Sequence, residues 1–186
     1  MKICVVSDSH DNRPMLTAAV HEAKELRGAE AVLHCGDVVA PTALRPLQQF
    51  GLPVHVIHGN NMGDTYAMFM LVQEPDSVIH YHGQDAGLNL GGKRIFIVHY
   101  PHYAEALALT GEWDVVCCGH DHRPAITPVE DIKGGESLIV NPGTVAGVGP
   151  RATYVMGDLE TMEFEIFDVP GGKVDHQPQH TPDYKK

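Results

Sequence analysis

The sequence is poor in basic side chains and has no long apolar run. Its 186 residues include 13 Lys and Arg against 24 Asp and Glu, a formal net charge of −11. No basic stripe interrupts this acidic background, so we do not expect extended nucleic acid as a partner. No apolar segment approaches the roughly 20 residues that a membrane-spanning helix needs, so no membrane partner is predicted. The first apolar run, residues 3–6, is too short for the core of a signal peptide.

Cysteine is also scarce. The four cysteines are Cys4, Cys35, Cys117 and Cys118; they lack CxxC spacing, and three of them lie in apolar runs or at their ends. Free cysteines in such runs behave as small buried hydrophobic residues, and a disulfide-stabilised domain would have more of them. We therefore predict a cytoplasmic protein with reduced thiols.

The first half of the chain alternates between strand-like and helix-like segments. Apolar runs at residues 3–6, 31–35 and 54–57 are typical of buried strands. Segments 14–27 and 41–50 each begin at a proline and are followed by a glycine, which is typical of helices. This alternation favours an α/β fold with a mainly parallel sheet covered by helices.

The second half contains more short strands. A helix is expected at about 101–110, and short apolar or alternating segments predict strands around it. These strands are expected at 77–81, 87–90, 94–98, 115–118, 126–130, 138–140, 153–156 and 164–169. We expect them to supply a second, mixed sheet that packs against the first.

Residues 1–169 are expected to form one domain and residues 170–186 a mobile tail. The tail is rich in proline, glycine and polar residues, and Val174 is its only aliphatic residue. Such a segment buries too little apolar surface to offset the entropy that is lost when it becomes ordered.

Histidine is present in excess. The chain has 13 histidines, and histidine is both the commonest metal ligand and a common acid–base group. Five of the predicted strands are followed directly by His, Asp or Asn. These residues are Asp8 and His10 after 3–6, Asp37 after 31–35, Asn60 after 54–57, His99 after 94–98, and His120 and His122 after 115–118. Because ligands bind at the carboxyl ends of the strands in α/β sheets, we expect these side chains to lie close together.

The chemistry of these side chains suits a pair of metal ions. Carboxylate oxygens, imidazole nitrogens and an amide oxygen suit divalent transition metals, with manganese as the first expectation and nickel, iron, zinc or cobalt as alternatives. Seven ligands are too many for one ion and suit two ions that share a carboxylate. Two cations about 3.5–4 Å apart would stabilise the attacking and leaving oxygens of a phosphoryl displacement. The glycines before Asp37, Asn60 and His120 are expected to let the backbone turn sharply.

Taken together and in order, these motifs resemble those of the calcineurin-like metallophosphoesterases. The motifs are Asp8-Ser9-His10, Gly36-Asp37, Gly59-Asn60, His99 and Gly119-His120-Asp121-His122. The short chain and the Asn-Pro-Gly-Thr run at 141–144 look like the small bacterial and archaeal phosphodiesterase branch, which is related in fold to the scaffold subunit of retromer. The resemblance implies a four-layer αββα sandwich of two mixed β-sheets flanked by helices, with the metal pair between the edges of the sheets.

The resemblance also implies a role for each ligand residue. Asp8, His10 and His122 would hold the first metal; Asn60, His99 and His120 would hold the second; and Asp37 would bridge them. A hydroxide that bridges both ions would attack the phosphorus of a small phosphate ester in line with the departing alkoxide. Asp37 and Asn60 are therefore expected to be catalytic residues as well as ligands.

Three positions depart from the family pattern. Many larger relatives have a histidine after Gly-Asn that helps to protonate the leaving group, but this chain has Asn61 there. Asp64, His102 or water could serve instead. The small branch usually has Thr-His-Gly-His where this chain reads Val-His-Tyr-Pro-His; we assign His99 as the ligand and place His102 beside the ligands or facing substrate, as a further catalytic candidate. Asp121 replaces the usual threonine and is expected to be solvated, with orientation of a ligand as the alternative.

Other residues have two interpretations each. Arg13 is interpreted equally as a substrate-phosphate contact or a surface residue, and His58 as a partner of a metal ligand or a sheet-end histidine. An exposed strand face is expected for His80 and His82, with an accessory metal site as the alternative. The apolar segment 68–72 is expected in the core, with a homo-oligomer contact or a pocket wall as the alternative.

The expected function is hydrolysis of a small phosphodiester. A phosphomonoesterase using the same site is the alternative within enzymes, and a catalytically inactive protein-binding scaffold of the same fold is the alternative outside them. The scaffold is disfavoured because all seven ligand positions carry residues that can bind metal. A metal-storage or sensing protein is a weaker alternative.

Overall fold

The computed structural model describes residues 1–172, and residues 173–186, most of the predicted tail, lie outside this description. Six strands form the first sheet, in the order β11-β10-β1-β2-β3-β4. They are β1 (Lys2–Val6), β2 (Ala31–His34), β3 (Val54–Val56), β4 (Ile79–Tyr81), β10 (Thr153–Asp158) and β11 (Glu163–Asp168). Strands β1 to β4 run parallel, and β10 and β11 are antiparallel to their neighbours.

Five strands form the second sheet, in the order β5-β6-β7-β9-β8. They are β5 (Ala86–Leu90), β6 (Lys93–Ile97), β7 (Val115–Cys117), β8 (Ala125–Glu130) and β9 (Glu136–Asn141). The three central strands are parallel, whereas the edge strands β5 and β8 run antiparallel to their neighbours β6 and β9. Both sheets are therefore mixed, as the sequence predicts.

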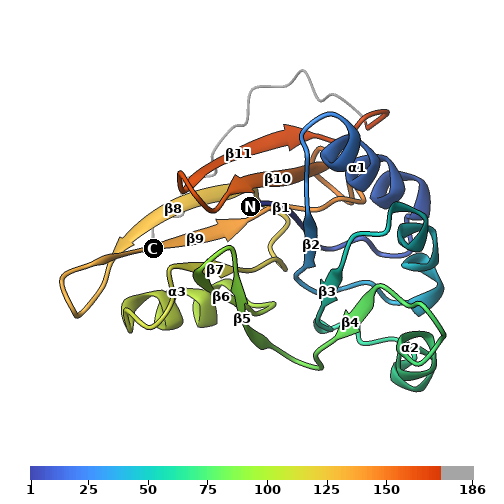
Figure 1. Ribbon diagram of the computed structural model, residues 1–186, viewed down its shortest axis with the longest axis horizontal. Helices are drawn as coiled ribbons and strands as arrows, with labels where there is room; N and C mark the ends of the chain where they lie inside the picture. The colour runs from blue at the N-terminus through green and yellow to red at the C-terminus, as the bar shows by residue number, and fades with distance from the viewer. Residues whose placement is uncertain (173–186) are drawn as a thin grey trace, which may run out of the picture.

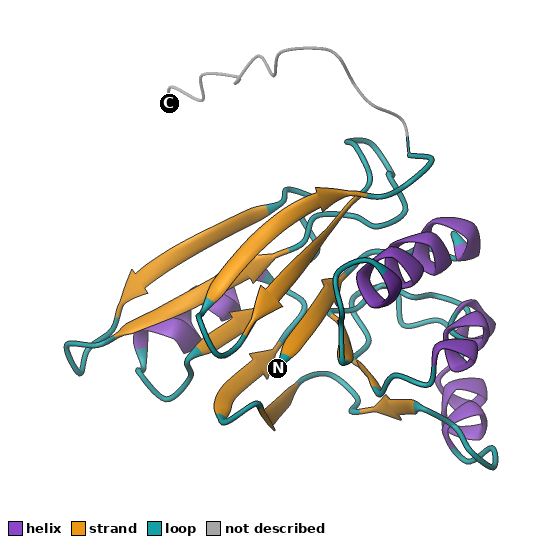
Figure 2. Ribbon diagram, turned by 45° about the horizontal axis from the view of Figure 1, so that its top comes forward, coloured by secondary structure: helices purple, strands orange, loops and turns teal. Residues whose placement is uncertain are grey.

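The apolar residues form three separate clusters, and these clusters define four layers. Along β1, Cys4 and Val6 contact the helices while Ile3 and Val5 face the second sheet. A strand covered on both faces reads as a continuous apolar run, because side chains alternate between the faces. The third cluster lies between the second sheet and the helix that includes Ala104. The predicted αββα order is confirmed (Figures 1 and 2).

Helices α1 (Arg13–Glu25) and α2 (Thr65–Val72) cover the first sheet, and α3 (Pro101–Leu109) covers the second (Figure 1). The Asn12 side chain caps α1 by accepting from the N–H of Met15. No helix among residues 1–172 has both the length and the apolar character that a bilayer crossing requires.

The predicted helix at 41–50 is wrong as an α-helix. The structure has two 3₁₀-helices there, η1 (Pro41–Ala43) and η2 (Arg45–Phe50). Pro46 explains the difference, because it lacks the N–H that an α-helix would need inside this segment.

Helix α2 contains the apolar segment 68–72. Its N-terminus is capped by Asp64, whose Oδ1 accepts from the N–H of Ala67 at 2.9 Å. Met68 and Leu71 are buried against the first sheet, which confirms core packing for them, while Phe69 and Met70 are exposed.

Candidate metal centre

The structure brings the side chains of all seven predicted ligands together where strands β1, β2, β3, β6 and β7 end. Five of them have backbone φ angles in the left-handed region, which residues other than glycine rarely adopt. They are Asp8 (53°), His10 (40°), Asp37 (56°), His120 (74°) and His122 (60°). Such conformations cost about 1 kcal/mol or more each and persist where the surrounding structure enforces them. This clustering of strain is typical of a functional site.

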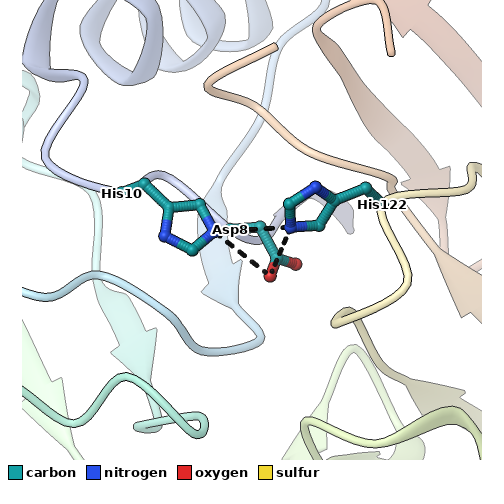
Figure 3. A group of neighbouring side chains, drawn as sticks. All are labelled: Asp8, His10 and His122. Carbon is teal, nitrogen blue, oxygen red and sulfur yellow. Dashed lines mark hydrogen bonds and ion pairs between the residues drawn. The ribbon is translucent and has the colours of Figure 1, made fainter. Parts of the chain in front are cut away.

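The first ligand group consists of Asp8, His10 and His122 (Figure 3). Asp8 Oδ1 lies 3.3 Å from His122 Nε2 and 3.8 Å from His10 Nε2, and the two Nε2 atoms are 3.3 Å apart. A hydrogen bond on the far side of the ring fixes the orientation of His122, since its Nδ1–H donates to the carbonyl oxygen of Val148 at 2.9 Å. Its Nε2 therefore presents a lone pair to Asp8.

A cation explains this arrangement. Asp8 Oδ1 is buried and has no hydrogen-bond partner among the described residues. A carboxylate oxygen that faces the lone pair of His122 Nε2 without a donor is costly to bury. A metal ion between these atoms would satisfy all of them, so the donor set fits the group that the sequence predicts.

The second ligand group is built around Asn60. Its Oδ1 lies 3.0 Å from His99 Nε2 and 2.9 Å from His120 Nδ1. His99 is buried, and its Nδ1–H donates to the carbonyl oxygen of Cys35 at 2.8 Å. Its Nε2 lone pair consequently faces an amide oxygen, a contact between two acceptors that a cation would again resolve.

Asp37 stands between the two groups. Its Oδ1 is 3.5 Å from His99 Nε2, and its Oδ2 is 3.9 Å from His10 Nε2. One carboxylate oxygen thus points toward each group, which is the arrangement that a bridging ligand requires. The next residue in the Asn60 loop holds this orientation, because the N–H of Asn61 donates to Oδ1 at 2.9 Å and its Nδ2 donates to Oδ2 at 2.6 Å.

The glycines of three motifs serve the site in two different ways. Gly36 has a φ of 108° and makes the sharp turn that the sequence predicts. For Gly59 and Gly119 the predicted reason is wrong, because neither has a positive φ. A Cβ at Gly59 would lie 2.2 Å from Asp37 Oδ1, and one at Gly119 would lie 2.0 Å from Ser7 Oγ. These two positions need glycine because the ligand loops approach each other so closely.

The Asn-Pro-Gly-Thr run fastens two ligand loops. Buried Thr144 donates through its hydroxyl to the carbonyl oxygen of Asp8 at 2.9 Å. The side-chain amide of Asn141 donates to the carbonyl oxygen of Gly119 at 3.2 Å and to Asp121 Oδ1 at 2.8 Å. Asp121 is exposed, yet its carboxylate is tied to Asn141, so it is not simply solvated. This role depends on contacts with distant loops, so the sequence of the run indicates the family but not the role.

A buried histidine supports the first motif from beneath. The N–H of Gly36 donates to His34 Nδ1 at 3.3 Å, so His34 Nε2–H donates to Ser9 Oγ at 2.9 Å. Burial, and next the nearby His99, lower the pKa of His34 to about 3. His34 is therefore neutral at pH 7 and holds Ser9 between the two ligands Asp8 and His10.

His102 lies apart from the ligand cluster. It is exposed in the first turn of α3, with its ring 4.2 Å from that of Tyr103 and 5.5 Å from that of Tyr100. The Tyr100 ring lies 4.7 Å from the ring of His120. Tyr100, whose place beside the ligands has no signal in the sequence, therefore lies between His102 and the ligands.

Arg13 and His58 each have a hydrogen-bond partner in the structure. Arg13 Nη2 donates to Thr42 Oγ1 at 2.6 Å on the exposed side of α1. His58 Nδ1 is 2.6 Å from the hydroxyl of Tyr81, and burial lowers the pKa of this histidine.

His80 and His82 flank a third histidine, His55, on the neighbouring strand. His55 Nδ1 and His82 Nε2 are 3.0 Å apart, and the His55 and His82 rings are inclined by 18° with centroids 5.2 Å apart. This geometry is that of two nearly coplanar imidazoles joined by a hydrogen bond. Within residues 1–172, two groups of potential ligands have ligand atoms that all lie within 4.8 Å of one another: Asp8, His10 and His122, and Asp8, Asp37 and His99. The cluster of His55, His80 and His82 is not such a group.

Comparison with known proteins identifies the family. The model of the calcineurin-like phosphoesterase superfamily domain matches residues 1–162, most of the chain. The chain belongs to this superfamily. The resemblance predicted from the motifs is thereby confirmed, and the protein is a metal-dependent phosphoester hydrolase.

Individual relatives of this phosphoesterase are distant but nearly equal in length. A phosphodiesterase of Methanocaldococcus jannaschii is 26% identical over 173 residues, which cover 91% of this chain and 98% of the relative. The solved structure of an archaeal phosphodiesterase superposes with a TM-score of 0.80 at 24% identity, covering 90% of this chain and 99% of the other. The zinc complex of Vps29 from Entamoeba histolytica has a TM-score of 0.60 at 17% identity, with coverages of 89% and 90%. At these identities the two solved structures show a shared fold.

Proposed function

We propose that this phosphoesterase is a phosphodiesterase that holds two divalent transition-metal ions, manganese first among them, and hydrolyses a small phosphate ester. One ion would be held by Asp8, His10 and His122 and the other by Asn60, His99 and His120, with Asp37 shared between them. When bound, the two ions supply the Lewis acidity that lowers the pKa of water and stabilises charge developing on the phosphoryl oxygens.

One observation carries the proposal: acceptor atoms face one another in both ligand groups. Asp8 Oδ1 is buried without a donor, and Asn60 Oδ1 faces the lone pair of His99 Nε2 at 3.0 Å. Asp37 supports two ions rather than one, because its two oxygens point to different groups. The M. jannaschii relative, which is named a phosphodiesterase, supports the choice of a diester.

The residues of this chain would act mainly by orientation. Asn61 donates to both oxygens of Asp37 and so keeps that carboxylate aimed at both groups. Asn60 presents its amide oxygen to His99 and His120, and its amide still carries two N–H donors. We assign one of these donors to a phosphoryl oxygen of the substrate, which makes Asn60 a catalytic residue.

Leaving-group protonation is assigned to His102 acting through water. Asp64 is engaged as the cap of α2, and Asn61 cannot donate a proton as an acid. His102 is exposed beside Tyr100, whose ring contacts those of His99 and His120. A water molecule between His102 and the departing oxygen would complete this path.

The proposal is tested by metal reconstitution. The purified protein is stripped with a chelator and supplied separately with manganese, nickel, iron, cobalt or zinc. Turnover of bis(4-nitrophenyl) phosphate and of 4-nitrophenyl phosphate is measured, and bound metal is counted by elemental analysis. We expect manganese to restore diester hydrolysis, faster than monoester hydrolysis, with about two ions bound per chain.

Matched variants locate the activity. Asp37→Asn keeps the shape of the side chain but removes the charge that both groups share, so we expect less than one bound ion per chain and a loss of about 100-fold or more in kcat. Asp76→Asn, an exposed residue outside the site whose φ is 62°, serves as the control and should bind metal normally.

Three outcomes contradict the proposal. Faster monoester turnover favours the phosphomonoesterase, and no turnover with any of the five metals favours the inactive scaffold. Full activity in Asp37→Asn overturns the ligand assignment.

The expected partner is a small phosphate ester rather than extended nucleic acid, and the expected location is the cytoplasm. The four cysteines support a reducing location, because all of them are buried and free. Burial also raises the pKa of the Cys4 and Cys118 thiols well above the ordinary value.

A further inference from the structure

A pocket of about 660 Å³ opens beside the second ligand group. Asn60 and His99 belong both to that group and to the lining of the pocket, so the pocket is continuous with the site. Its other walls come from the loop between β4 and β5, from β6 and the residues after it, and from α3. Its volume lies within the range of about 300–1,000 Å³ that is typical of small-molecule pockets.

Aromatic and aliphatic side chains make up much of this wall. Phe96, Tyr100, Tyr103, Leu107 and Met62 all line the pocket. Two of them are exposed although they are large and apolar: Tyr103 at 48% and Met62 at 49%. The Tyr100 and Tyr103 rings meet edge to face at 5.7 Å, so an inserted ring would find aromatic partners. A flat apolar group in the pocket would lie against this partly exposed wall.

The charge of the pocket disfavours a second phosphate. The described residues that line it include neither lysine nor arginine, and they include the exposed carboxylate of Asp85. A second anionic group near Asp85 would therefore meet a negative charge, and the described lining offers no lysine or arginine to pair with it. Gln84 is also exposed in the lining, and its amide oxygen, like the Asp85 carboxylate, can accept hydrogen bonds from N–H donors.

We propose that this pocket binds an uncharged aromatic or heteroaromatic ring of the substrate, attached through oxygen to the phosphorus that reacts at the neighbouring ligand cluster. The inference rests on the proposed function, because the pocket is placed by its continuity with Asn60 and His99. It narrows the substrate class to aryl or heteroaryl phosphate esters with no second phosphate.

The test measures binding without turnover. Dimethylphosphinate and methyl(phenyl)phosphinate are both monoanions without an ester bond, and they differ only in that a phenyl ring replaces one methyl group. Each is titrated calorimetrically into the manganese-loaded protein. We expect the phenyl compound to bind about tenfold more tightly or better, because its ring leaves water for the aromatic wall.

Two variants change the pocket and one leaves it intact. Tyr103→Ala removes an aromatic wall, and Ala106→Trp fills the pocket from α3. In both, we expect the phenyl advantage to fall to about twofold or less while dimethylphosphinate binds as before. Tyr66→Ala is the matched control: Tyr66 is an even more exposed tyrosine, at 72%, on α2 and outside the pocket.

The outcomes separate this inference from the proposed function. Equal binding of the two phosphinates by the unaltered protein, or failure of both to bind, overturns the aromatic pocket. A phenyl advantage that survives in Ala106→Trp overturns its location. Hydrolysis of bis(4-nitrophenyl) phosphate by the same preparation shows independently whether the phosphodiesterase proposal stands.

Discussion

Replacing Gly59 by alanine should damage the site without unfolding the protein. Gly59 is buried in the loop after β3, and its φ is not in the left-handed region, so alanine imposes no backbone strain. The added Cβ would nevertheless lie 2.2 Å from Asp37 Oδ1 and 2.6 Å from His99 Nε2. One methyl group would therefore collide with two ligands of the second group.

The size of the collision sets the size of the effect. Ordinary contacts of a Cβ begin at 3.4 Å, so from its 2.2 Å position Asp37 Oδ1 would have to retreat by about 1.2 Å. A misplacement of about 1 Å in a catalytic arrangement costs about 100-fold in rate. A factor of 100 corresponds to about 2.7 kcal/mol of transition-state stabilisation. We expect at least this loss in kcat/KM for a diester, together with loss of one bound ion.

The measurement compares Gly59→Ala with Gly28→Ala. Gly28 has open space around its missing Cβ but a φ of 75°, so alanine there strains the backbone without touching the site. We expect Gly28→Ala to lower the free energy of unfolding by about 1 kcal/mol and to keep full activity. Gly59→Ala should show the opposite pattern in urea unfolding of the metal-free protein and in diester turnover. Wild-type activity and two bound ions in Gly59→Ala would refute the assignment of Asp37 and His99 to one ligand group.

Three further predictions concern residues around the ligands. Asn61→Ala removes the side-chain hydrogen bond from Nδ2 to Asp37 Oδ2, so metal affinity measured by competition with a chelating dye should fall about 10–100-fold. Unchanged affinity would contradict the role of Asn61 in orienting Asp37. His34 has a pKa of about 3 in the fold, against 6.5 ordinarily, so the unfolded chain binds more protons between these values and the stability present above pH 6.5 is lost as the pH falls. Urea unfolding should show a loss of about 2 kcal/mol by pH 5 from this residue, and His34→Gln should flatten that part of the pH dependence; an equally steep dependence in the variant would assign the loss to other groups. His102→Ala should slow esters with alkyl leaving groups by about 100-fold and spare nitrophenyl esters, whose leaving group needs no proton; equal slowing of both classes would rule out His102 as the proton donor.

The ligand residues could be found from the sequence because each lies at the end of a buried strand. The runs before Asp8 and Asp37 are apolar at almost every position, since β1 and β2 are covered on both faces. A parallel sheet then carries such strand ends to one edge, whatever loops join them. Their placement follows from a local pattern and a topological rule, and neither requires knowledge of side-chain contacts.

The features that escaped prediction depend on contacts between distant segments. The carbonyl oxygen of Cys35 sets the tautomer of His99, and that of Val148 sets the tautomer of His122. Backbone carbonyls carry no sequence signal. Gly59 is required by the nearness of Asp37, 22 positions away, rather than by its own φ. The α-helix predicted at 41–50 is a local error: Pro41 and Gly51 mark helix ends, but Pro46 interrupts the α-helical hydrogen bonds between them.

Each ligand group takes residues from both sheets, and this division gives the four-layer fold its functional meaning. Asp8 and Asp37 follow strands of the first sheet, whereas His99 and His122 follow strands of the second. The distance between the halves of each group is therefore set by the apolar cluster between the sheets. Protein interiors are close-packed and transmit small changes in volume. A change in the packing between the sheets should thus alter the ligand distances even when it touches no ligand, so this core belongs to the machinery of the site as well as to its support.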